Sequence, residues 1–161
     1  MLKKLMGILG LGSGAEENGL SRDPATALKK VYLAQLRLAT QIRAHAELAP
    51  YPHVAQQLNQ VAAEKLRSCE VLREALRKLG SYIGNEAPGE IYSGGNHWER
   101  MARDVRDQSA LEQTLSELSG LLVHEAPEES KFLSRMLGAE KVHREVVTGL
   151  LMRADPQAHQ I

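Results

Sequence analysis

Residues 139–143 read AEKVH and residues 63–67 read AEKLR, so the tripeptide AEK occurs twice, 76 positions apart, in a chain of 161 residues. When the two glutamates are aligned, a proline lies 12 or 13 residues upstream in each copy, at Pro52 and at Pro127. Proline is favoured in the first turn of a helix, where its missing N–H is not needed. The pattern predicts a duplicated helical hairpin, and the alternative is a chance similarity between two amphipathic helices.

Helix-breaking residues divide the chain into four expected helices, at about 24–48, 52–79, 98–124 and 127–153. The composition agrees, because 43% of residues are hydrophobic, only 4% are aromatic, and β-branched residues form no alternating runs. Short connections predict that the first two and the last two helices form antiparallel hairpins. The Gly-rich segment 80–97 is long enough to cross the length of a helix. We therefore expect an all-α four-helix bundle of two hairpins joined by a long crossover.

Outside this bundle, expected at residues 23–154, the sequence indicates a flexible tail at 1–22 and a short tail at 155–161. Basic residues precede a short apolar run near the start of the chain. Residues 1–14 therefore have three interpretations: a frayed tail, an amphipathic peptide that docks on a protein or a membrane surface, and a cleaved export signal.

Charge and cysteine content limit the classes of partner and the cellular compartment that we expect. Lys plus Arg and Asp plus Glu both number 20, so no basic field indicates nucleic acid. The single cysteine, Cys69, cannot form an internal disulfide and is interpreted as a small packing residue. No apolar run approaches the roughly 20 residues needed to span a bilayer. We expect a cytoplasmic protein.

Polar residues interrupt two apolar faces. In the last helix, a single face is expected to carry Leu133, Met136, Glu140, His143, Val147 and Leu150. In the second helix, the corresponding face is expected to carry Gln57, Val61, Glu64, Arg67, Val71 and Ala75. Because a buried carboxylate without a partner is costly, a metal, a cation or water must compensate it.

The AEKVHREV segment, the duplicated hairpin and the crossover resemble the rubrerythrin and bacterioferritin branch of the ferritin-like superfamily, over roughly residues 25–153. Bundles of this type bind two irons with a Glu-x-x-His pair from each of two helices and a Glu from each of the other two. The resemblance implies metal ligands at Glu140, His143 and Glu64, and it places Asp107 in the window of a partner carboxylate.

The implied ligand set is incomplete. Arg67 occupies the second histidine position, and no Asp or Glu occurs from Pro24 to Ala46. We expect Arg67 to replace one metal by pairing with Glu64, and also with Glu140, inside the bundle. The alternative is that its side chain reaches the surface along its methylene stem.

Three outcomes remain open for the centre of the bundle. The first is a salt-bridge and hydrogen-bond cluster without metal. The second is a single Fe, Mn or Zn ion bound by Glu64, Asp107, Glu140 and His143. The third is a di-iron site that other residues complete. Gln35 and Glu112 lie at suitable depths and could complete a site or form hydrogen bonds.

Two functional classes follow. The first is a ferritin-like, rubrerythrin-related protein that has lost di-iron oxidase chemistry and acts as a structural or interaction module, expected as a homodimer or larger assembly without catalytic residues. The second is an iron-dependent oxidase or peroxidase that reduces O2 or peroxide. The rubredoxin-type module of rubrerythrins is missing, because the chain has no Cys-x-x-Cys pair.

The remaining histidines and the aromatic residues near the crossover are given ordinary roles. Surface imidazoles are expected at His45, His53, His97, His124 and His159. Tyr92 and Trp98 are expected to be packing residues.

Overall fold

The computed structural model describes residues 20–156, and the expected docking peptide at residues 1–14 lies outside this range. The described chain contains four helices and no strand; the helices are α2 (Pro24–Glu47), α3 (Pro52–Lys78), α4 (His97–Leu122) and α5 (Pro127–Arg153). For the part of the chain that the structure describes, the prediction of an all-helical fold with four helices is confirmed. The expected helix ends differ from these bounds by at most two residues.

Local sequence explains where the helices begin. Proline occupies the first turn of α2, α3 and α5. At α2, the side chain of Asp23 accepts a hydrogen bond from the backbone N–H of Thr26 at 2.9 Å. At α4, Asn96 and Glu99 form a reciprocal capping box. Each such cap stabilises its helix by about 1 kcal/mol, so the end of the crossover is defined by Asn96 as well as by packing.

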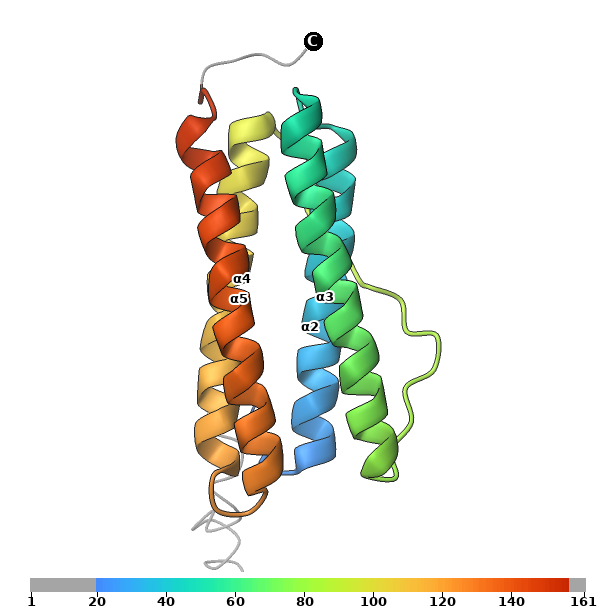
Figure 1. The fold of residues 1–161 in the computed structure, drawn as a ribbon. Coiled ribbons are helices and arrows are strands. Elements are labelled where there is room, and N and C mark those ends of the chain that lie inside the picture. Colours follow the sequence, from blue (N-terminus) through green and yellow to red (C-terminus); the bar gives the residue numbers. More distant parts are fainter. Residues whose placement is uncertain (1–19, 157–161) are drawn as a thin grey trace, which may run out of the picture.

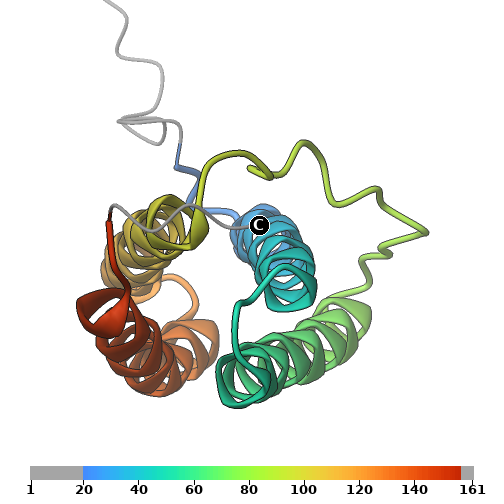
Figure 2. The ribbon, with the colours of Figure 1, turned by 90° about the horizontal axis from the view of Figure 1, so that it is seen from above.

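The helices stand upright around one core (Figure 1). The closest packing is between α2 and α3 and between α4 and α5, and the two pairs meet mainly through α2 and α4. Helices α3 and α5 approach each other much less. Seen from above, the long connection from α3 to α4 runs around the outer side of α2 (Figure 2). None of the helices within residues 20–156 is long and apolar enough to cross a membrane.

The apolar face predicted for α5 is confirmed, because all six of its expected residues are buried. The face predicted for α3 is wrong, since Arg67 and Val71 are exposed. The buried face of α3 is instead formed by Val54, Leu58, Val61, Ala62, Lys65, Cys69, Leu72 and Leu76. The predicted face of α3 followed from the alignment of the repeat with α5. The observed face is favoured because it buries Leu58, Leu72 and Leu76 and so removes more apolar surface from water.

Candidate functional site

The carboxylate of Glu140 is fully buried and receives a side chain from each of the four helices. Gln35 Nε2 on α2 donates to Oε1 at 2.5 Å, and Lys65 Nζ on α3 donates to Oε2 at 2.5 Å. Gln108 Nε2 on α4 donates to Oε2 at 2.8 Å and to the backbone oxygen of Glu140 at 2.9 Å. His143, one turn further along α5, places Nδ1 3.1 Å from Oε2. These donors compensate the buried charge.

The side chains of Lys65 and Glu140 both have zero exposure, so their ion pair is shielded from water. Burial acts to raise the pKa of Glu140, but hydrogen bonds from His143, Lys65 and Gln108 and the charge of Lys65 outweigh it and lower this pKa strongly. Burial lowers the pKa of Lys65, and the charge of Glu140 opposes that shift. The carboxylate is therefore held in its ionised form by a fixed set of donors.

A chain of contacts leads from this pair toward the surface. His143 Nε2 lies 2.7 Å from Glu64 Oε2, while the other ring nitrogen faces Glu140. The side chain of Glu64 is 38% exposed and that of His143 only 5%. The hydrogen bond to His143 is the main cause that lowers the pKa of Glu64. His143 thus links the buried carboxylate of Glu140 to the partly exposed carboxylate of Glu64.

This donor set does not fit a metal ion. Both oxygens of Glu140 already accept N–H bonds, both nitrogens of His143 face carboxylates, and the ammonium of Lys65 stands against Glu140 where a cation would have to bind. No group of three or more His, Cys, Asp or Glu side chains is placed to hold a metal among residues 20–156. A metal would have to displace at least the lysine.

The structure brings together some of the residues that the sequence singled out. Glu64, Glu140 and His143 form one row of contacts, and Gln35 joins them. Glu112 is buried nearby but pairs with Arg144, whose Nε lies 3.2 Å from Oε2. Burial raises the pKa of Glu112, and the charge of Arg144 opposes this.

Two expected residues lie elsewhere. Arg67 is exposed, so its assignment as the internal cation is wrong, and Lys65 has that place. Asp107 does not contact Glu140; it accepts hydrogen bonds from Gln41 at 2.9 Å and from Arg103 at 3.1 Å. On a helix, successive residues point about 100° apart, so the residue after Asp107, the amide Gln108, faces the centre instead.

A second buried polar group escaped the sequence reasoning. His45 is fully buried, with Nδ1 2.7 Å from Asp104 Oδ2 and Nε2 2.6 Å from the backbone oxygen of Tyr92. Gln41 donates to Asp104 at 2.8 Å and accepts from the backbone N–H of Tyr92 at 2.9 Å. Burial raises the pKa of Asp104, and the hydrogen bond with His45 opposes this. The group attaches the crossover to α2.

Surface positions were predicted for His45 and His97, and both predictions are wrong because the two residues are only 0% and 8% exposed. Burial also lowers the pKa of His97. The signal for His45 was its spacing from Leu38 and Ile42, which are buried on the same face of α2. A histidine in the last turn of a helix is typical of an exposed helix end, but the crossover covers His45.

Comparison with models of known protein families gives no match, and comparison with curated proteins finds no similar sequence. The proposal below therefore rests on the described residues, which form four helices with Lys65 and Glu140 paired at the centre.

Proposed function

We propose that the chain is a ferritin-like, rubrerythrin-related bundle that has lost di-iron oxidase chemistry and acts as a structural or interaction module. The observation that carries this proposal is the ion pair between Lys65 and Glu140. In a metal-binding relative, a cation bound by Glu140 and His143 would supply the charge that Lys65 supplies here.

The arrangement of the helices supports the proposal. Two closely packed helix pairs, joined by a long connection, have the connectivity of ferritin-like bundles. Glu140 and His143 retain the Glu-x-x-His spacing on a buried face of α5. The other half has diverged, because α3 presents Lys65 to the centre and α2 presents the amide Gln35 in place of a carboxylate.

Iron chemistry tests the proposal directly. Purified protein is titrated anaerobically with ferrous ion and then exposed to air, and the absorbance of oxo-bridged ferric ion is followed. We expect no signal beyond the oxidation of free iron, because Lys65 and a metal beside Glu140 repel each other. Two tightly bound irons per chain, or a single ion that binds without displacing Lys65, would contradict the proposal.

The assembly and partner are separate parts of the same proposal. We expect a homodimer or a larger homo-oligomer, which light scattering after size-exclusion chromatography measures. A partner that binds through residues 1–14 is tested by deleting these residues and comparing what co-purifies. Recovery of a folded monomer with the same associated proteins before and after the deletion would contradict an interaction role for this segment.

A further inference from the structure

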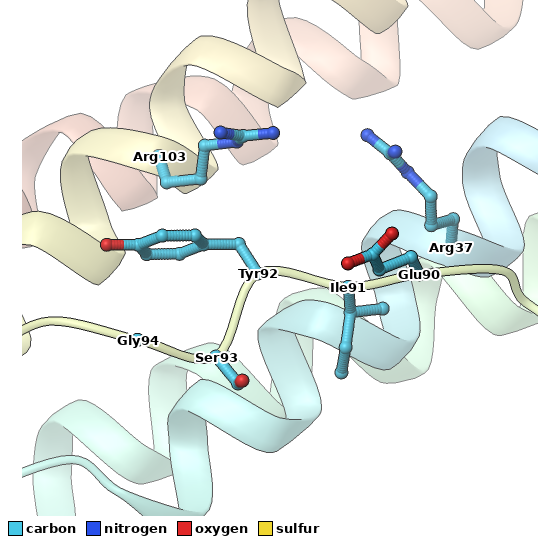
Figure 3. A pocket seen from close by; sticks show the side chains of 7 residues that line it. All are labelled: Arg37, Glu90, Ile91, Tyr92, Ser93, Gly94 and Arg103. Carbon is cyan, nitrogen blue, oxygen red and sulfur yellow. The ribbon is translucent and has the colours of Figure 1, made fainter.

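A hollow of about 490 Å³ opens between the crossover and the sides of α2 and α4 (Figure 3). Its base is the crossover around Ile91 and Tyr92, and Arg37 from α2 and Arg103 from α4 extend over it from opposite sides. The volume is in the range of small-molecule sites, about 300–1,000 Å³. The hollow is separate from the polar centre around Glu140.

Both guanidinium groups keep N–H donors that form no hydrogen bond within the described residues. Arg103 hydrogen bonds within the described chain through Nε alone, to both oxygens of Asp107 at 3.1 and 3.2 Å. Its guanidinium carbon lies 5.4 Å from the ring centroid of Tyr92, so the ring supports it from below. Arg37 Nη2 lies 3.8 Å from Asp107 Oδ2, which is too far for a good hydrogen bond. Both side chains are about half-exposed, at 44% and 39%.

The base of the hollow is held in place by the bundle. The backbone N–H of Tyr92 donates to Gln41, and its backbone oxygen is bonded by the buried His45. Asp107, which orients Arg103, is itself held by Gln41. Arg103 and the base are thus fixed through one network, which lowers the entropy lost on binding a ligand.

We propose that this hollow binds a phosphate-type dianion, with Arg37 and Arg103 as the recognition residues. Guanidinium groups donate paired N–H bonds that match the oxygens of phosphate, and both arginines keep N–H donors that Asp107 does not occupy. The ring of Tyr92 offers apolar surface beneath Arg103, which fits the organic part of a small phosphomonoester.

Glu90 supplies a test of opposite sign. It lines the same hollow, is exposed, and makes no ion pair within the described residues. Its carboxylate therefore repels an incoming phosphate, and removing its charge must strengthen binding. A site that bound cations instead would respond in the reverse direction.

The experiment uses the full chain and isothermal titration calorimetry with phenyl phosphate and with inorganic phosphate. Arg37→Gln and Arg103→Gln are each expected to weaken binding at least tenfold, and Glu90→Gln to strengthen it about threefold. Arg37→Lys keeps the charge but loses the paired donors, so an intermediate loss is expected. Arg43→Gln, an exposed change on the same helix, is the control and should leave binding unchanged.

The two probes identify the source of the phosphate group. Tighter binding of phenyl phosphate supports a phosphomonoester ligand, and equal binding supports free phosphate in the same arginine site. The proposal is overturned if neither probe binds, if Arg43→Gln weakens binding as much as Arg103→Gln, or if Glu90→Gln weakens it. Circular dichroism of every variant confirms that the helices are retained.

Discussion

Lys65 Nζ lies 2.5 Å from Glu140 Oε2, and neither side chain is exposed to solvent. The two residues come from α3 and α5, which pack against each other much less than α2 packs against α3 or α4 against α5. A buried ion pair contributes little net stability when both partners are present, but loss of one partner leaves a charge that nothing compensates. The pair is therefore a position where single substitutions are costly.

Lys65→Met is expected to destabilise the protein by about 3–5 kcal/mol, because Glu140 would remain buried without its cation. Urea denaturation followed by circular dichroism measures the free energy of unfolding. Arg67→Met is the matched control and should cost no more than about 0.5 kcal/mol, since this side chain is exposed. The double change Lys65→Met with Glu140→Gln should be more stable than Lys65→Met alone. Equal costs at the two cations would refute the assignment of Lys65.

Lys65→Glu should make stability depend on metal. This change places a third carboxylate beside Glu140 and Glu64, next to His143, and a divalent cation could then compensate the excess charge. We expect the thermal midpoint of this variant to be lower than that of the native protein and to rise when Mn²⁺ or Zn²⁺ is added. A metal ion present at 100 times its dissociation constant would add about 2.7 kcal/mol to the free energy of unfolding.

The native protein and Arg67→Glu serve as controls for the metal experiment, and neither should show a comparable shift. A metal-induced rise in the native midpoint equal to that of Lys65→Glu would contradict the view that the lysine occupies the cation position.

Gln41→Leu should loosen the crossover. The amide oxygen of Gln41 accepts the backbone N–H of Tyr92, and its nitrogen donates to Asp104. Removing these bonds leaves buried groups unpaired and should cost about 1–3 kcal/mol. Hydrogen exchange measured by NMR should show faster exchange of the Tyr92 amide, while amides in the middle of α5 change little. Gln57→Leu, at an exposed position, should leave Tyr92 protected.

Acid should destabilise the bundle through Glu140. Its pKa is lowered from a reference value of 4.5, so its ionised form contributes stability above that pH, and this contribution is lost as pH falls toward the folded-state pKa. Glu64 acts in the same direction. Urea midpoints between pH 7 and pH 3 should therefore fall mainly below about pH 4.5. A variant with Lys65→Met and Glu140→Gln should show a flatter profile, and an equally steep one would exclude the pair as the cause.

Cys69 should react slowly with thiol reagents. Its residue is 2% exposed, and burial raises the pKa of its thiol to about 11. Little thiolate is therefore present at pH 8, and the thiolate is the reactive form. We expect labelling by an aromatic disulfide reagent to be at least a hundredfold slower in native protein than in urea. Rapid labelling under native conditions would indicate local opening of α3.

Helical periodicity and helix-breaking residues were sufficient to predict the elements of the fold. Proline and Asp or Asn at helix starts gave bounds close to those observed, because caps depend on a few neighbouring residues. The buried face of α5 was also predicted, because Leu133, Met136, Val147 and Leu150 recur at helical spacing.

The face of α3 had two solutions in the sequence. One passes through Glu64 and Arg67, and the other through Leu58, Lys65 and Leu72. The repeat favours the first, because it aligns Glu64 with Glu140. The second is the buried one, and Lys65 is its only charged residue. A lysine within an otherwise apolar face was the signal for the internal cation.

The same limit applies to Asp107, Gln108 and His45. The residue that faces Glu140 is the amide Gln108, and the presence of the carboxylate Asp107 beside it in the sequence does not indicate which of the two points to the centre. Burial of His45 depends on where a long crossover lies, and Gly-rich segments carry little periodic information about their path.

The meeting of four helices on one carboxylate also determines how they can slide. A shift of α2, α3 or α4 along α5 by one turn is about 5.4 Å, which would carry Gln35, Lys65 or Gln108 out of reach of Glu140. A wholly apolar interior would accept several such alignments at similar free energy, as coiled coils without a polar core residue do. In this bundle, Glu140 serves as an axial lock that gives the four helices a single alignment.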